Sequence, residues 1–150
     1  MEIAGLIALS FVGSIFWLVN TEGTAIVYGS QRAWNPLVVG LCCAIGQLGM
    51  HTVLYFAGGS VLARWRWLRE REERVRARYG ERLEKRYLAL SAVAALTGVP
   101  PVVVLSVLAS GFGIPARHYL PLMFPLRVIR FTILAALGLQ IAAYWRAMFS

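Results

Sequence analysis

Acidic residues are scarce in this chain, and aspartate is absent altogether. The 150 residues include only 7 acidic side chains against 15 lysines and arginines, and only 2 histidines. Paired carboxylates carry general acid and base catalysis in many enzymes, so their scarcity removes that chemistry. The sequence also has no phosphate-binding loop, no metal-ligand spacing and no nucleophile beside a base. We therefore expect no enzyme, no metal site and no cofactor.

Cysteines are equally few. Cys42 and Cys43 are adjacent to one another within an apolar stretch. Neither a disulfide framework nor a metal-binding motif follows from such a pair. We expect both cysteines to act as small packing residues.

Apolar sequence, in contrast, is abundant: 59% of the residues are hydrophobic, and the mean hydropathy is +0.65. Apolar stretches cover residues 3–19, 36–58 and 131–144, and a helix needs about 20 residues to cross a bilayer. The first stretch has no basic segment before it and no small-residue cleavage site, which favours a retained helix over a signal peptide. We therefore predict an all-α integral membrane protein.

Positive charge is concentrated between residues 64 and 86, within a net charge of +8. Arginine-rich loops beside membrane spans lie on the cytoplasmic side. Apolar residues recur near helical spacing from 61 to 90, which predicts an amphipathic helix on anionic lipid headgroups, with Gly80 as a candidate break. Nucleic acid is the less favoured partner for this charge. We place residues 59–87 in the cytoplasm and the protein in the bacterial inner membrane.

Two apolar regions are interrupted in a way that suits re-entrant hairpins. Residues 20–35 are polar and rich in helix breakers, and they enclose a short apolar piece at 25–28. Residues 89–110 are apolar but contain Pro100 and Pro101, which cannot continue a helix. Irregular backbone at membrane depth is tolerated only when it is buried in protein or lines a wet cavity. We predict two opposed re-entrant helical hairpins.

Each predicted hairpin precedes a long helix. Pro36 suits the first turn of a helix that we expect to end near Gly58. Pro121 and Pro125 precede a span that we expect over residues 131–149. Because the halves start from opposite sides of the membrane, they predict an inverted repeat. The single membrane domain then divides into a first half-repeat at 1–58, a basic segment at 59–87 and a second half-repeat at 88–150.

The order of several residues resembles the DedA family, also called the VTT-domain or SNARE-associated membrane protein family. The shared pattern is a glutamate, a glycine seven residues later, and a helix that ends in a spaced Gly, Tyr and Gly. In this chain those positions are Glu22, Gly29, Gly46, Tyr55 and Gly58. A proline-containing segment at 98–101, followed by small residues at 109–111, extends the resemblance to roughly residues 20–135.

This resemblance implies a protein that moves lipids across bilayers, by scrambling them or by recycling polyprenyl phosphate carriers, with proton coupling in some members. Members of the family usually have arginines beside the second proline motif, where this chain has Thr97 and Val103. Arg127 and Arg130 can supply the charge instead, as in a shorter branch of the family.

Glu22 is the leading candidate site residue, because it is the only acidic residue between Ile3 and Arg69. A carboxylate at membrane depth is costly unless it is paired, protonated or hydrated, so it could bind a proton or a headgroup. The alternative is a first-turn carboxylate that complements a helix dipole. Arg32 could pair with Glu22 or anchor the chain at the interface.

Two arginines and a proline turn complete the primary candidates. Arg127 and Arg130 share a helix face, where they could hold a lipid phosphate or mark the cytoplasmic end of the last helix. Thr97, Pro100 and Pro101 could line the transport path or form a plain turn.

Gln47 and His51 are secondary candidates. They lie four residues apart on the predicted helix, so they share a face. They could face a cavity, or they could be hydrogen-bonded packing residues.

Together these features predict a lipid transporter of the scramblase type, which moves a phospholipid or a polyprenyl phosphate between leaflets with optional proton coupling. One alternative is a proton-coupled carrier of a small solute. Another is a non-transporting scaffold that acts through its basic helix. We expect membrane lipids as partners, together with a second copy of the chain, because so short a chain needs one to enclose a cavity.

Overall fold

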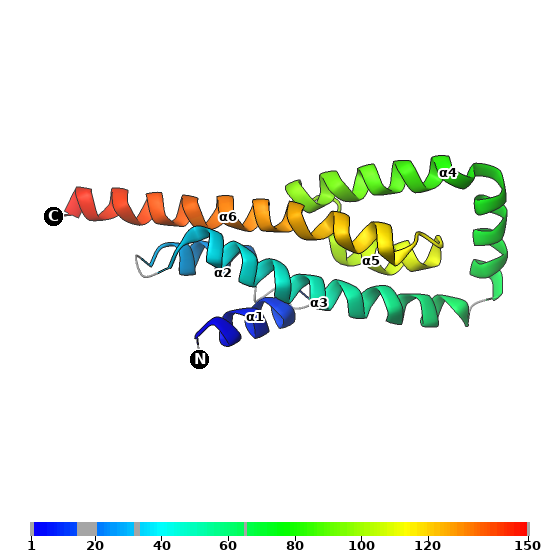
Figure 1. Cartoon of the computed structure of the whole chain (residues 1–150), viewed down its shortest axis with the longest axis horizontal. Coiled ribbons are helices and arrows are strands. Elements are labelled where there is room, and N and C mark those ends of the chain that lie inside the picture. Colours follow the sequence, from blue (N-terminus) through cyan, green and yellow to red (C-terminus); the bar gives the residue numbers. More distant parts are fainter. Residues whose placement is uncertain (1, 15–20, 32–33, 65, 150) are drawn as a thin grey trace. The chain divides into compact units, whose positions relative to one another are not determined.

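The computed structural model describes residues 2–14, 21–31, 34–64 and 66–149. Within those residues every regular element is an α-helix (Figure 1), so the all-α prediction is confirmed. The helices are α1 (Glu2–Gly13), α2 (Thr21–Gly29), α3 (Pro36–Ala63), α4 (Arg66–Thr97), α5 (Val102–Gly111) and α6 (Ala116–Phe149). They form two compact units: unit 1 comprises Met1–Met50 and Phe124–Ser150, and unit 2 comprises His51–Met123.

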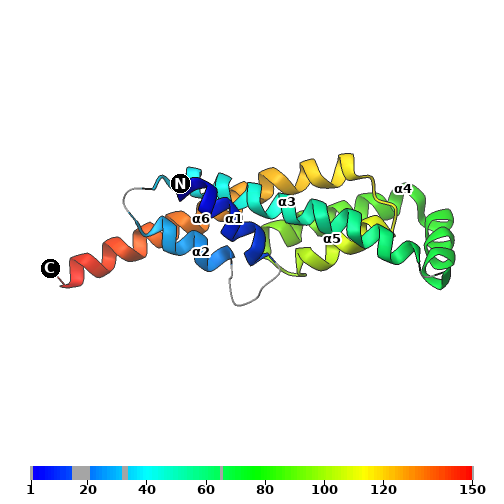
Figure 2. The same ribbon diagram turned by 90° about the horizontal axis from the view of Figure 1, so that it is seen from below.

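Unit 1 is built from α1, α2, the first part of α3 and the last part of α6 (Figure 2). Its core is made of apolar residues from all four helices, most of them small. The buried members are Leu6, Ala25, Val39, Cys42, Cys43, Ala44, Phe131 and Ala135. Small residues let helix backbones approach closely, which is how helices associate in lipid.

Two glycines bring α2 and α6 into backbone contact. A Cβ atom added at Gly29 of α2 would lie 2.2 Å from the carbonyl oxygen of Ala135 on α6. A Cβ atom added at Gly138 of α6 would lie 2.2 Å from the carbonyl oxygen of Ile26 on α2. Real Cβ atoms essentially never come within 3.0 Å of such neighbours, so any larger residue would force the two helices apart.

Unit 2 packs α4, α5 and the adjoining parts of α3 and α6 around aromatic rings. The ring of Tyr119 on α6 stacks on that of Tyr55 on α3, with centroids 6.2 Å apart. It also lies 6.4 Å from the ring of Tyr87 on α4. Tyr87 in turn meets Phe112 edge to face at 5.9 Å. Aromatic pairs at such distances stabilise a core beyond their buried area.

α3 is longer than predicted, since it continues to Ala63 instead of ending near Gly58. Gly58 is used for packing: a Cβ atom there would lie 2.9 Å from the Cα atom of Val107 on α5. A glycine inside a membrane-type helix can therefore serve close helix approach rather than termination.

α6 begins at Ala116, so it includes the span predicted over residues 131–149 and extends it toward the N-terminus. Pro121 and Pro125 lie inside it. Each proline removes only one backbone donor from the helix, and neighbouring groups in packed membrane helices compensate for such losses. The two prolines and the two candidate arginines therefore belong to the same helix.

Two other helix ends differ from expectation. α1 ends at Gly13, so it is shorter than the predicted helix over 3–19, and residues 15–20 lie outside the described part. α4 continues through Gly80, although its ribbon bends within the helix (Figure 1). The predicted interruption at the prolines is present, because α4 ends at Thr97 and α5 begins at Val102.

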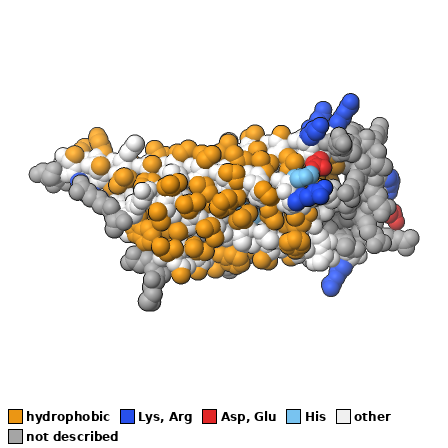
Figure 3. Space-filling model, in the orientation of Figure 1, with side chains coloured by type: hydrophobic (Ala, Val, Ile, Leu, Met, Phe, Trp, Pro, Cys, Tyr) orange, Lys and Arg blue, Asp and Glu red, His pale blue; other side chains and the backbone are white. Residues whose placement is uncertain are grey.

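Two helices have the length and composition of membrane spans: Pro36–Ser60 within α3 and Ala116–Met148 within α6. α1, α2 and α5 have 12, 9 and 10 residues, fewer than the about 20 that a bilayer requires. Large apolar side chains such as Phe56 and Ile133 are exposed, and hydrophobic side chains cover much of the face shown in Figure 3. These features are compatible with a membrane protein.

Candidate functional site

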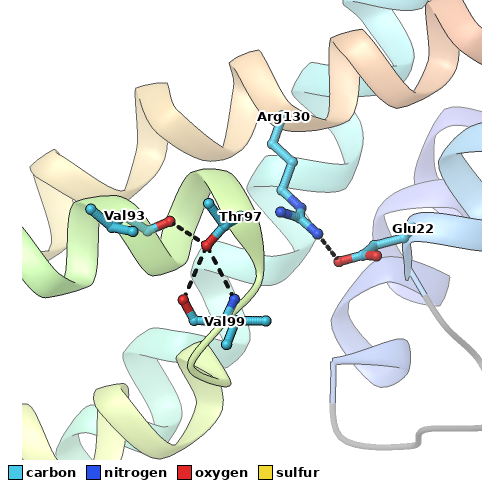
Figure 4. Close-up of polar contacts among 5 residues, drawn as sticks. All are labelled: Glu22, Val93, Thr97, Val99 and Arg130. Carbon is cyan, nitrogen blue, oxygen red and sulfur yellow. Dashed lines mark hydrogen bonds and ion pairs between the residues drawn. The ribbon is translucent and has the colours of Figure 1, made fainter.

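Unit 1 contains an ion pair between Glu22 and Arg130, whose side chains point toward one another from α2 and α6 (Figure 4). The Nη2 group of Arg130 donates a hydrogen bond to Oε1 of Glu22. The arginine side chain is 12% exposed and the glutamate side chain is 37% exposed. The pair is thus partly buried, and the carboxylate keeps one side open to the surroundings.

The local sequence explains how both side chains reach this contact. Glu22 occupies the first turn of α2, where a carboxylate is also favoured by the helix dipole. Gly29 and Gly138 hold α2 and α6 at backbone contact distance. Glu22 is therefore a first-turn carboxylate, which is the alternative that the sequence left open, and it also pairs with a guanidinium. Its binding of a proton or a headgroup stays a prediction.

Arg127 adds a second guanidinium on the same face of α6, one turn before Arg130. It is only 6% exposed, and its guanidinium carbon lies 5.8 Å from the centroid of the Phe131 ring. A cation at this distance from a ring is attracted by the ring quadrupole. We refer to Glu22, Arg127 and Arg130 as the charged cluster; these three residues have two positive charges and one negative charge.

The turn that contains Thr97, Pro100 and Pro101 belongs to unit 2. Its polar contacts are with nearby backbone groups. The Oγ1 atom of Thr97 lies 2.8 Å from the carbonyl oxygen of Val93 and 3.0 Å from that of Val99, and it accepts a hydrogen bond from the Val99 amide at 3.3 Å (Figure 4). The Val99–Pro100 peptide bond is cis, and Pro101 precedes the first turn of α5. These contacts describe a local turn with an exposed Thr97.

Gln47 and His51 are both buried on α3. The Oε1 atom of Gln47 has no hydrogen-bond partner within the part of the chain that the structure describes. His51 lies in unit 2, where its Nδ1 atom is 3.1 Å from the Oγ atom of Ser106. Arg32, the remaining candidate, lies outside the described residues.

Sequence reasoning missed the partners of His51. Ser106 on α5 and Tyr119 on α6 are both fully buried, and their hydroxyl oxygens lie 3.0 Å apart. Serine and tyrosine occur throughout the chain, so residue type does not distinguish Ser106 and Tyr119 from the others. The one available signal is the position of Ser106, a hydroxyl residue inside the apolar stretch 102–109.

No group of three or more His, Cys, Asp or Glu side chains within the described ranges could hold a metal ion. Comparison with known proteins finds no match: no family model, no curated protein and no solved structure is similar to this chain. The candidate site therefore rests on its own geometry.

Proposed function

We propose that this chain is an integral membrane protein that moves a lipid with a phosphate headgroup, either a phospholipid or a polyprenyl phosphate, between the leaflets of a bilayer. The observation that carries the proposal is the Glu22–Arg130 ion pair, with Arg127 one turn away, inside an apolar helical unit. Ionisable residues among membrane helices are costly, so they mark functional sites by default.

The charge of this cluster suits a phosphate. Arginine presents a planar fork of donors that matches phosphate oxygens. Arg127 and Arg130 together exceed the charge of Glu22, so an anion restores neutrality. Because Arg130 already donates a hydrogen bond to Glu22, a phosphate must compete with the carboxylate for the guanidinium. This competition keeps binding weak enough for the headgroup to leave, as transport requires.

Proton coupling follows from the same competition. When a phosphate binds Arg130, the Glu22 carboxylate is released from this contact, and we propose that the release couples headgroup movement to protons. Because Glu22 is 37% exposed, we propose that it meets water in the transport cycle. The acyl tails stay in the bilayer while the headgroup passes the cluster.

We also propose that the short helices α2 and α5 enter the membrane without crossing it. Their 9 and 10 residues are too few for a span. Each is followed along the chain by a helix that has the length of a span. This arrangement is what an inverted repeat with broken helices requires.

The test is leaflet exchange of a fluorescent phospholipid in vesicles that contain the purified protein, measured by quenching from outside. We expect Arg130→Gln to slow exchange about tenfold or more, because a charge-assisted contact contributes about 1.5–3 kcal/mol. Arg127→Gln should slow it as well. Arg146→Gln is the matched control, because Arg146 lies on the same helix, is exposed and donates only to the Ser30 carbonyl among the hydrogen bonds described. Exchange at the wild-type rate in both site variants would contradict the proposal.

The same vesicles separate the two other functions. A proton-coupled solute carrier would take up solute under a pH gradient without exchanging lipids. A scaffold would lose its cellular function on deletion of residues 64–86 and would show neither lipid nor solute movement when reconstituted.

A further inference from the structure

Unit 2 contains a buried hydrogen-bond network that the proposed lipid site does not use. Its centre is Ser106 on α5, which meets groups from three directions. The Oγ atom lies 3.1 Å from Nδ1 of His51, 3.0 Å from the hydroxyl oxygen of Tyr119 and 2.9 Å from the carbonyl oxygen of Val102. His51 is 1% exposed, and Tyr119 and Ser106 are fully buried.

A serine hydroxyl has one proton to donate and two lone pairs that accept. Here the proton of Ser106 has two alternative acceptors, Nδ1 of His51 and the carbonyl oxygen of Val102. When Nδ1 carries no proton, Ser106 donates to it. When Nδ1 is protonated, the imidazole donates to Ser106, which turns its own proton to Val102. Tyr119 can donate to Ser106 in both arrangements.

From this geometry we propose that His51 is a proton-binding site of the folded protein, and that Ser106 is its switchable hydrogen-bond partner. One proton moves from solvent to the imidazole and later returns to solvent, and only an N–H bond forms and breaks. A buried polar group is costly when its hydrogen bond is lost. The switch avoids that cost at Nδ1, because this atom keeps its contact with Ser106 in both protonation states.

The titratable groups around His51 have hydrogen-bond partners of their own or are exposed. Tyr55 lies one turn after His51 on α3 and donates to the Ile114 carbonyl at 2.7 Å. Tyr87 on α4 donates to the Leu105 carbonyl. α5 has no titratable residue. On α6, Arg117 and His118 precede Tyr119; both are exposed, and His118 pairs with Glu84 of α4 at 2.6 Å.

The test is nuclear magnetic resonance of the histidine rings in the full-length protein in lipid nanodiscs. The chain has only 2 histidines, so in the His118→Gln variant all histidine signals come from His51. We expect these signals to move reversibly when the pH is changed between about 5 and 8, while circular dichroism reports an unchanged helix content. His51 signals that stay fixed over this range would overturn the proposal. So would movement that occurs only together with loss of helix.

Variants of the partners test the role of Ser106. Ser106→Ala should shift the His51 midpoint by about half a pH unit or more, because hydrogen bonds to charged groups are the stronger ones. Ser91→Ala is the control, because Ser91 is a fully buried serine of α4 in the same unit. If Ser106→Ala does not fold, Tyr119→Phe is the second variant. It removes the hydroxyl that contacts Ser106 but keeps the aromatic ring, and it should also shift the His51 midpoint. An unchanged midpoint in every folded variant of Ser106 and Tyr119 would overturn the switch.

Discussion

The main polar contact of unit 1 joins two charged side chains, Glu22 and Arg130. The main polar network of unit 2 joins an imidazole and two hydroxyl groups, those of His51, Ser106 and Tyr119. The first leaves its carboxylate 37% exposed, whereas the second is almost completely buried. Unit 1 thus has formal charge on a partly exposed side chain, and the buried network of unit 2 consists of an imidazole and two hydroxyl groups.

This difference matters for what each unit can bind. A charged group that remains accessible can exchange its partner for an anion of another molecule. A fully buried neutral network excludes such ligands, but it can still accept a proton if its hydrogen bonds rearrange. Under the two proposals made above, unit 1 binds a headgroup and His51 of unit 2 binds a proton. Each proposal can be tested separately.

The largest effect should come from the glycine contact that holds the charged cluster together. Gly138→Ala would place a Cβ atom 2.2 Å from the Ile26 carbonyl oxygen, so α2 must move away from α6. We expect a loss of about 2–3 kcal/mol in the free energy of unfolding and a drop in lipid exchange. Unfolding in mixed micelles, followed by circular dichroism, measures the first quantity.

Gly23→Ala provides the matched control on α2, because no atom of the residues that the structure describes lies within 4 Å of a Cβ atom at that position. It should be neutral or should stabilise the helix by up to about 1 kcal/mol. Equal destabilisation by the two variants would mean that the α2–α6 contact does not position the site.

The ion pair should give the next largest effect. Glu22→Gln leaves the largely buried Arg130 guanidinium without its carboxylate, and we expect a loss of about 2 kcal/mol, below the value for a fully buried pair because Glu22 is partly exposed. A double-mutant cycle with Arg130→Gln isolates the coupling between the two side chains. The coupling should fall when salt is added, because exposed charges are screened. Additive effects of the two substitutions would contradict a direct pair.

Sequence reasoning could find one half of this pair but not the other. Glu22 is conspicuous because it is the only acidic residue in a long apolar region. Arg32, Arg127 and Arg130 were all available as partners, and the choice depends on a contact between residues that lie 108 positions apart. Such a contact follows from how α2 and α6 pack, which local sequence does not encode.

The helix ends show a similar limit. The sequence does not distinguish a glycine that ends a helix from one that lets another helix approach. In the structure Gly58 lets α5 approach α3. Pro121 and Pro125 suggested a helix start, yet α6 includes both. The interruption between Thr97 and Val102 was predictable, because two consecutive prolines cannot continue a helix. The structure adds that Gly98 has a positive φ of 84°.

The smallest effect should come from a single neutral hydrogen bond in unit 2. Tyr55→Phe removes the hydroxyl that donates to the Ile114 carbonyl at 2.7 Å but keeps the ring that stacks on Tyr119. We expect a loss of about 1 kcal/mol, and this loss should not depend on salt because no charge is involved. Tyr144→Phe on α6, where the side chain is exposed, should change stability by less than about 0.5 kcal/mol. A salt-dependent loss in Tyr55→Phe would show that the aromatic core of unit 2 also relies on charge, and the contrast with the Glu22–Arg130 pair of unit 1 would then fail.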